Sequence, residues 1–132
     1  MQEKNFKAIN VTIPYKQDVI PFLDYISEEA RVINAVNTIV NKDGKLYGYN
    51  TDFSGLSSLI MRQGVSLENK KVAVLGSGGT SNTAFAVANS LGASSVLKVS
   101  RTEKEGYITY SELYEKHSDI QVIINTTPCG MF

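Results

Sequence analysis

Lys71-Val72-Ala73-Val74-Leu75-Gly76-Ser77-Gly78-Gly79 is the stretch of sequence that decides the fold of this chain. Its first part, residues 71–75, predicts a buried strand, because a short apolar run stops at a glycine loop. An alanine-rich helix is expected directly afterwards, over residues 80–91, closed by Gly92. A strand, a glycine loop and a helix in this order form the turn that holds a pyrophosphate in dinucleotide-binding folds.

The small residues of this loop each have a physical use in such a turn. Gly76 permits the tight turn, and Gly78 lets the backbone approach a pyrophosphate. Free amides near Thr80 and the positive end of the helix dipole favour an anion there. Ser81 takes the position where a third glycine or an alanine is common, and it is small enough for close helix–strand packing. The sequence therefore predicts a dinucleotide site, the alternative being a glycine-rich turn without a ligand.

Two more strands are expected downstream, over residues 95–99 and 121–125, with a short helix over 111–117. The resulting β-α-β-α-β pattern predicts an α/β fold with a parallel sheet and right-handed crossovers. Arg101 follows strand 95–99 at its tip, which is where NAD-selective folds place a carboxylate. A guanidinium suits a ribose 2′-phosphate, so the sequence favours NADP. The alternative is an exposed arginine in a charged loop, close to Glu103 and Glu105.

Upstream of the glycine loop the sequence predicts five elements. They are a strand over residues 6–13, a helix over 16–33, strands over 35–40 and 45–49, and a helix over 52–63. Pro14 ends the first strand, and Asp43-Gly44 between two β-rich runs is typical of a hairpin. Gly64 suits the C-terminal cap of the last of these helices.

Several polar residues lie at or near the ends of these upstream elements. A carbonyl reduced by hydride needs a proton, which Lys16 could deliver while the carboxylate of Asp52 holds it in place. Thr12, Asn37 and Thr51 are short hydrogen-bonding residues of the kind that a polyhydroxylated substrate requires. The alternative is structural, with Lys16 beginning a helix and Asp52 capping one.

The composition excludes several classes of protein. The 132 residues are 42% hydrophobic and carry 13 basic and 13 acidic residues, which predicts neither nucleic-acid nor membrane partners. The single cysteine, Cys129, fits a cytoplasmic protein, and no metal-ligand spacing is present. Both ends look truncated, because a terminal buried strand needs neighbours, so we expect an internal piece of a longer enzyme. The sequence does not decide whether the oligomeric state is a monomer or a homodimer.

Taken together, these motifs resemble the shikimate dehydrogenase family over nearly the whole chain. That family carries Asn-Val-Thr-(Ile/Val)-Pro-x-Lys, Gly-Ala-Val-Asn-Thr and Asn-Thr-Asp. It continues with a Gly-x-Gly-Gly loop, Asn-Arg-Thr and Asn-(Thr/Ala)-(Thr/Ser)-Pro-x-Gly-Met. Here they appear, in the same order, at residues 10–16, 34–38, 50–52, 76–79, 100–102 and 125–131. Asn34 replaces the usual glycine, and Ser100 replaces the usual asparagine.

The resemblance implies NADP-dependent, reversible reduction of 3-dehydroshikimate to shikimate in aromatic amino-acid and chorismate biosynthesis. It implies part of a substrate-binding domain over residues 1–52 and the first part of a Rossmann-like NADP-binding domain over 53–132, with 53–64 as a linking helix. By position, Lys16 and Asp52 would be catalytic, and Thr12, Asn37 and Thr51 would bind the substrate. The cofactor-binding residues would be Gly76, Ser77, Gly78, Gly79, Thr80, Arg101, Thr102, Thr126 and Met131, with Cys129 and Gly130 near the nicotinamide.

Two other functions stay open beside this one. One is a quinate or dual quinate/shikimate dehydrogenase, and the other is a non-catalytic relative that binds a dinucleotide as a regulatory module. The family's N-terminal Ser-x-Ser motif and its C-terminal glutamine-bearing helix are absent from these 132 residues. We therefore expect the isolated chain to be inactive and its parent to be active.

Overall fold

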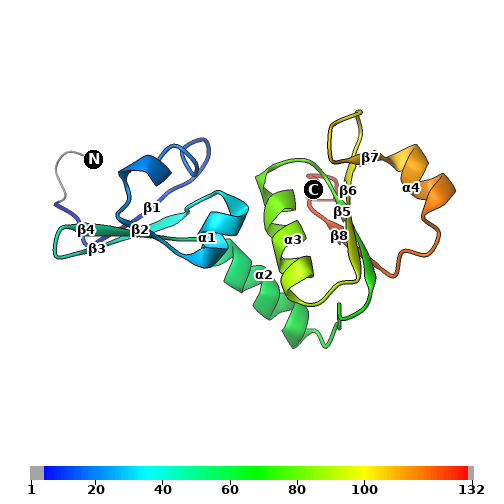
Figure 1. Ribbon diagram of the computed structural model, residues 1–132, viewed down its shortest axis with the longest axis horizontal. Coiled ribbons are helices and arrows are strands. Elements are labelled where there is room, and N and C mark those ends of the chain that lie inside the picture. The colour runs from blue at the N-terminus through cyan, green and yellow to red at the C-terminus, as the bar shows by residue number, and fades with distance from the viewer. Residues whose placement is uncertain (1–4, 131–132) are drawn as a thin grey trace. The chain divides into compact units, whose positions relative to one another are not determined.

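A computed structural model of the chain describes residues 5–130. They fold into two compact units that divide between Gly55 and Leu56 (Figure 1). This division and the predicted domain boundary after residue 52 both fall inside helix α2 (Thr51–Arg62). Within the described residues, no helix is long and apolar enough to cross a membrane.

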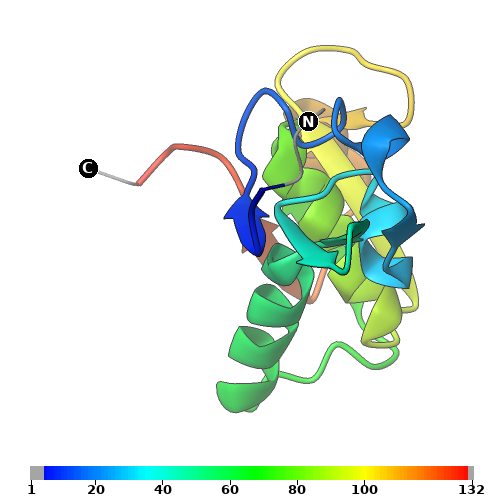
Figure 2. The ribbon, with the colours of Figure 1, turned by 90° about the vertical axis from the view of Figure 1, so that its left-hand side faces the viewer.

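The first unit contains a mixed four-stranded sheet. Its strands are β1 (Ala8–Asn10), β3 (Thr38–Lys42), β4 (Lys45–Tyr49) and β2 (Tyr25–Ile26), in the order β1-β3-β4-β2. β3 and β4 form the predicted hairpin, and Asp43 and Gly44 turn it with φ of 52° and 83°. Helix α1 (Glu28–Ile33) packs against β4 (Figures 1 and 2). The predicted strands of the hairpin are confirmed, although β3 begins at Thr38.

The single helix predicted over residues 16–33 is wrong. The structure has turns, a short 3-10 helix (Ile20–Phe22), strand β2 and then α1 in this span. β2 pairs in parallel with β4, where Tyr25 lies opposite Tyr47. The side chain of Ser27 then accepts a hydrogen bond from the backbone N–H of Ala30, so a new helix starts at residue 28.

The apolar spacing that predicted this helix reflects burial rather than helicity. One core of the first unit collects the apolar residues of the span and of the hairpin. Its members include Val19, Ile20, Leu23, Ile26, Ala30, Val36, Ile39 and Leu46. Turns and a short strand bring these side chains to the same side as a helix would, so periodicity alone does not separate the two cases.

The second unit is built on a sheet of four parallel strands. They are β5 (Lys71–Leu75), β6 (Ser95–Ser100), β7 (Ile108–Thr109) and β8 (Val122–Asn125), in the order β7-β6-β5-β8. Read in chain order this is 3-2-1-4, the strand order that begins a Rossmann fold. The predicted α/β fold with a parallel sheet is thus confirmed.

Small residues bring the helix that follows the glycine loop close to the sheet. Helix α3 (Gly79–Ser90) packs on β5 and β6 (Figure 1). Ser81 is completely buried, as its size predicts, and Ala84 and Ala88 join Val72 in the core. Leu56 and Ile60 of α2 pack against the same core.

The connection between β6 and β7 contains no helix. Parallel neighbours are usually joined by a crossover of about a dozen residues or more, whereas residues 101–107 suffice here. The Nζ atoms of Lys98 and Lys104 lie 4.6 Å and 4.9 Å from the ring centre of Tyr107. These cation–π contacts attach the loop to the sheet. Helix α4 (Tyr110–Lys116) follows directly after β7.

Candidate functional sites

Lys16 and Asp52 form an ion pair in the first unit. Lys16 Nζ donates to Asp52 Oδ2 at 3.0 Å, although 36 positions separate the two residues in the sequence. The Lys16 side chain is 29% exposed and that of Asp52 is 50% exposed, so a ligand can reach both. The structure thus brings together the two residues that the sequence singles out for catalysis.

The backbone around Lys16 is held by the segment that precedes β3. The carbonyl oxygen of Lys16 accepts from Val36 N at 2.8 Å. Just before it, Thr12 and Tyr15 close a turn in which Tyr15 N donates to Thr12 O at 2.9 Å. Thr12 is exposed in this turn. Lys16 therefore lies in a turn. This excludes the first half of the structural alternative, in which Lys16 begins a helix.

The other half of the structural alternative, in which Asp52 caps a helix, is excluded because Asn50 is the residue that caps α2. Its Oδ1 accepts from the backbone N–H groups of Asp52 and Phe53 at 3.0 and 3.4 Å. Its Nδ2 donates to Ala35 O at 2.9 Å, which ties the start of α2 to the segment before β3. Since Asn50 caps the helix, the carboxylate of Asp52 is available to Lys16.

Asn37 and Thr51 form a second polar pair in the same unit. Asn37 Nδ2 donates to Thr51 Oγ1 at 3.0 Å, and Thr51 N donates to Asn37 Oδ1 at 3.0 Å. Thr38 Oγ1 also donates to Asn37 Oδ1, at 3.0 Å. These bonds fix the orientation of the amide. Four of the five residues predicted for catalysis and substrate binding therefore occur as two hydrogen-bonded pairs.

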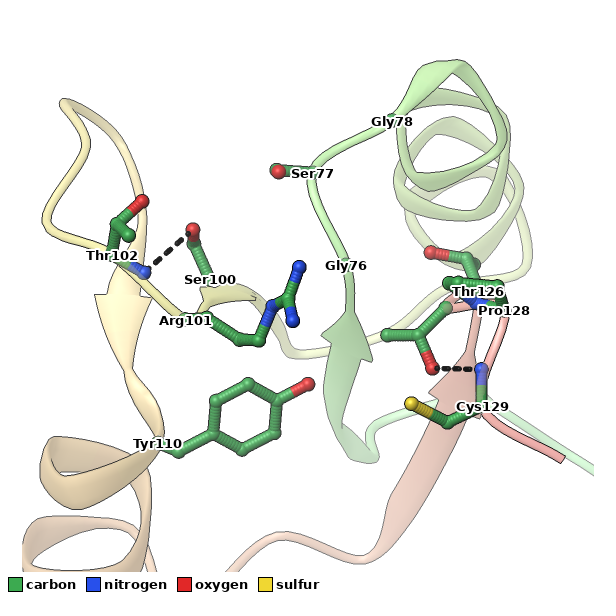
Figure 3. Close-up of a pocket in the computed structure, with 11 residues that line it drawn as sticks. Gly76, Ser77, Gly78, Ser100, Arg101, Thr102, Tyr110, Thr126, Pro128 and Cys129 are labelled. Atoms are coloured by element: carbon green, nitrogen blue, oxygen red, sulfur yellow. Dashed lines mark hydrogen bonds between the residues drawn. The ribbon is translucent and has the colours of Figure 1, made fainter.

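The second unit contains a pocket of about 360 Å³ at the carboxyl ends of its parallel strands (Figure 3). Six predicted cofactor residues line it: Gly76, Ser77, Gly78, Arg101, Thr102 and Thr126. The other lining residues are Ser100, Tyr110, Thr127, Pro128 and Cys129. Gly79 and Thr80 begin α3 and are not part of the lining. Met131 lies outside the described residues.

The glycine loop has the shape that a pyrophosphate requires. Gly76 has φ of +116°, and a Cβ there would lie 2.7 Å from Thr126 Oγ1, so only glycine fits without displacement. Thr126 Oγ1 in turn donates to Leu75 O at 2.6 Å. At Gly78 and Gly79 a Cβ would meet no atom within 4 Å, which leaves open space beside the start of α3. The residues present therefore fit a dinucleotide.

Arg101 gives the pocket its charge. It is exposed, and among residues 5–130 it is the single charged residue in the lining, to which no carboxylate of this range belongs. Glu103 and Glu105, which weaken the argument for NADP on sequence grounds, do not line the pocket. Ser100 Oγ accepts from Thr102 N at 3.3 Å and shapes the turn that carries Arg101. A cationic pocket without acids suits a phosphate better than a bare ribose hydroxyl.

Tyr110 is the lining residue that lies outside every motif singled out in the sequence, whereas Ser100, Thr127 and Pro128 belong to such motifs. It follows β7, which has only two residues and therefore shows no alternation that a sequence pattern could reveal. The signal that could have found it is positional, because residues just beyond parallel strands gather at one edge of a sheet.

Comparison with known proteins places this arrangement in a family. Residues 1–39 match the family described as shikimate dehydrogenase substrate binding domain. A shikimate dehydrogenase (NADP(+)) of Clostridium perfringens strain 13 is 42% identical over 136 residues, covering 96% of this chain and 50% of the relative. Shikimate dehydrogenase from Aquifex aeolicus has a TM-score of 0.81 at 35% identity, covering 96% and 50%. Shikimate dehydrogenase 1 from Peptoclostridium difficile has a TM-score of 0.76 at 36% identity, covering 96% and 49%.

The fold and the two sites define a class of protein, namely α/β chains in which a small mixed-sheet unit precedes a Rossmann-like unit with a glycine loop. Within this class the sequence and the structure agree on one family. The chain belongs to the shikimate dehydrogenase family. It spans about half the length of the curated relatives it matches.

Proposed function

We propose that the protein containing this chain is an NADP-dependent oxidoreductase that reversibly reduces 3-dehydroshikimate to shikimate, a step toward chorismate and the aromatic amino acids. The observation that carries the proposal is the contact between Lys16 Nζ and Asp52 Oδ2 at 3.0 Å. The names of relatives such as the C. perfringens enzyme support both the reaction and the cofactor.

The Lys16–Asp52 pair provides the acid–base chemistry. Bound NADPH supplies a hydride. As the substrate carbonyl is reduced, its oxygen gains negative charge, and the ammonium of Lys16 stabilises that charge and donates a proton from Nζ. The carboxylate of Asp52 accepts a hydrogen bond from the ammonium and keeps it in place. In the reverse direction the neutral amine of Lys16 accepts the proton of the substrate hydroxyl.

The Asn37–Thr51 pair provides recognition of substrate hydroxyls. Both side chains hold donors and acceptors in fixed positions, because each is already bound to the other. A site built to bond hydroxyl groups rejects analogues that lack them, since its polar groups would then be left unpaired. Exposed Thr12, in the turn before Lys16, adds a hydroxyl to this set.

The pocket of the second unit provides the NADP site in this proposal. Gly76, Ser77, Gly78, Gly79 and Thr80 would hold the pyrophosphate through open backbone at the start of α3. The guanidinium of Arg101, with Thr102, would bind the 2′-phosphate, and Thr126 would lie toward the nicotinamide. No carboxylate of residues 5–130 lines the pocket, which supports NADP over NAD.

The test is NADPH formation from NADP⁺ and shikimate by the purified full-length protein. We expect turnover with shikimate, and we expect Lys16→Ala to lower kcat by about a hundredfold to ten-thousandfold with the fold retained. Lys45→Ala, at an exposed lysine of β4, is the matched control. Preferential turnover of quinate would replace the proposal by a quinate dehydrogenase. Nucleotide binding without turnover of either substrate would identify a regulatory module.

Three further measurements accompany this proposal. The isolated 132-residue chain is expected to show no turnover in the same assay. Size-exclusion chromatography of the full-length protein distinguishes the monomer from the homodimer. Cell fractionation tests the predicted cytoplasmic location.

A further inference from the structure

Arg101 and Tyr110 are neighbours at the same edge of the parallel sheet. β6 and β7 pair in parallel, with Ser100 opposite Thr109 in the register. Arg101 and Tyr110 are therefore the next residues beyond the two strand ends. The connection between β6 and β7 contains no helix, and α4 begins directly after β7. The start of α4 therefore lies beside the end of β6 at this edge of the sheet.

Both side chains reach into the pocket. Figure 3 shows the Arg101 guanidinium and the Tyr110 ring extending into it, facing Thr126 and Cys129 across the cavity. Within the part of the chain that the structure describes, Tyr110 supplies the one aromatic ring of the lining, which otherwise consists mainly of glycine, serine and threonine. The residue is 38% exposed, so part of its surface is free for contact.

The chemistry of a 2′-phosphorylated adenosine relates these two positions. The 2′-phosphate and the adenine are attached to adjacent carbons of the same ribose. A ligand whose 2′-phosphate meets Arg101 must therefore place its adenine within a few ångströms of that residue. Adenine is flat and aromatic, and stacking on an aromatic side chain is a common way to bind it. In the strand order β7-β6-β5-β8, the glycine loop follows β5, Arg101 follows β6 and Tyr110 follows β7. Tyr110 is therefore the neighbour of Arg101 on the side away from the glycine loop.

We propose that the ring of Tyr110 is the surface on which the adenine of the dinucleotide packs, beside the 2′-phosphate held by Arg101. This inference rests on the proposed NADP-dependent function. It assigns the two residues separate tasks: Tyr110 binds the part that NADP and NAD share, and Arg101 binds the phosphate that distinguishes them.

The test uses the full-length protein and two adenosine probes that lack nicotinamide, 2′,5′-ADP and 5′-AMP. Calorimetry measures the affinity of the unsubstituted protein and of Tyr110→Leu, Tyr110→Phe, Tyr114→Leu and Arg101→Gln. Tyr114→Leu is the matched control, because Tyr114 lies one turn further along α4, is 90% exposed and does not line this pocket. Thermal unfolding of each variant reports whether the fold is retained.

We expect Tyr110→Leu to weaken both probes by the same factor, about tenfold. Tyr110→Phe keeps the ring and should keep the affinity, as should Tyr114→Leu. Arg101→Gln should weaken 2′,5′-ADP alone. In the enzyme assay, Tyr110→Leu should raise the KM for NADPH and leave kcat unchanged.

A spectroscopic variant keeps the inference testable if the leucine variant does not fold. The chain has no tryptophan of its own, so Tyr110→Trp adds one reporter to this unit while retaining an aromatic surface. Relative to the unsubstituted protein, its added fluorescence should be quenched by 2′,5′-ADP.

Unchanged probe affinity in a folded Tyr110→Leu variant, or unquenched fluorescence in Tyr110→Trp at saturating probe, overturns the adenine assignment while leaving the proposed reaction intact. Failure of the unsubstituted protein to turn over shikimate with NADP⁺ refutes the proposed function instead. The first result comes from the binding of adenosine probes and the second from the turnover of shikimate, so the two failures are distinguishable.

Discussion

The two units of this chain build their sites in different ways. In the first unit, polar side chains far apart in the sequence bind one another, as Lys16 binds Asp52 and Asn37 binds Thr51. In the second unit, the pocket is formed where parallel strands end, by a glycine loop and small residues around Arg101. Substitutions in the first unit should therefore act on chemistry, and those in the second on nucleotide binding.

The largest effect is expected for Asp52→Asn. The amide keeps the size of the side chain but removes the charge that holds the Lys16 ammonium, so kcat should fall by about a hundredfold or more. Affinity for NADPH should be unchanged, because Asp52 does not line the pocket proposed for the nucleotide. Asp43→Asn is the control: this acid lies in the hairpin turn at φ of 52°, a conformation that asparagine tolerates. Steady-state kinetics and NADPH titration check both variants, and a loss shared by kcat and NADPH affinity would break the comparison between the units.

The next effect is expected for Gly76→Ala. An alanine backbone is strained at φ of +116°, and the new Cβ would lie 2.7 Å from Thr126 Oγ1. The free energy of unfolding should therefore fall by about 1–3 kcal/mol, and NADPH binding should weaken. Gly106→Ala is the control: its φ of +77° is also positive but lies closer to the left-handed helical region, and its Cβ would meet no atom within 4 Å. Urea denaturation measures the loss of unfolding free energy in both variants, and the larger loss expected for Gly76→Ala reports its less favourable φ together with the contact with Thr126. Equal losses would show that the contact contributes nothing.

Arg101→Gln should change cofactor preference. Hydrogen bonds to charged groups contribute about 1.5–3 kcal/mol, so the ratio of kcat/KM for NADPH to that for NADH should fall by about tenfold to a hundredfold. Activity with NADH should be preserved, since NADH has no 2′-phosphate. Arg62→Gln, at the end of α2 and outside the pocket, is the control. A parallel loss with both cofactors would mean that Arg101 maintains the fold rather than selecting the phosphate.

The smallest effect is expected at the other end of β5, away from either site. The ammonium of Lys71 donates to the carboxylate of Asp119 and lowers the pKa of Asp119. Because the folded pKa lies below the unfolded one, near 4, the pair stabilises the fold above that pH and loses this effect as pH falls through the folded pKa. Asp119→Asn should therefore reduce the acid sensitivity of the denaturation midpoint slightly, and salt should diminish the difference. Glu115→Gln, at an exposed acid of α4, is the control for the removal of one surface carboxylate.

The second unit was the more predictable of the two, because its signals are local. The strand, glycine loop and helix around Gly76 follow one another directly, and each follows from neighbouring residues. The bounds of β5 agree with the prediction at both ends. Tyr110 is the exception: a strand of two residues forms only because β6 lies beside it, which the local sequence does not encode.

The first unit depends on contacts between distant residues. The span over residues 16–33 is not a helix because Tyr25 and Ile26 pair with Tyr47 and Gly48 of β4. Such a pairing is decided by tertiary structure and overrides apolar spacing. Sequence spacing alone could not show that Lys16 and Asp52 meet, and only the family resemblance implied that they are partners. The structure places them in contact, although the local structure that positions Lys16 differs from the predicted one.

The helix-free loop after β6 also has a consequence for proteolysis. Residues 101–106 are exposed and include two trypsin targets, the peptide bonds after Arg101 and Lys104. Exposed loops without regular structure are preferred sites of nicking. A nucleotide held by Arg101 would cover the first of these bonds. The rate at which trypsin cuts after Arg101, compared with the rate after Lys104, therefore reports how much of the pocket is occupied, and this measurement needs no shikimate.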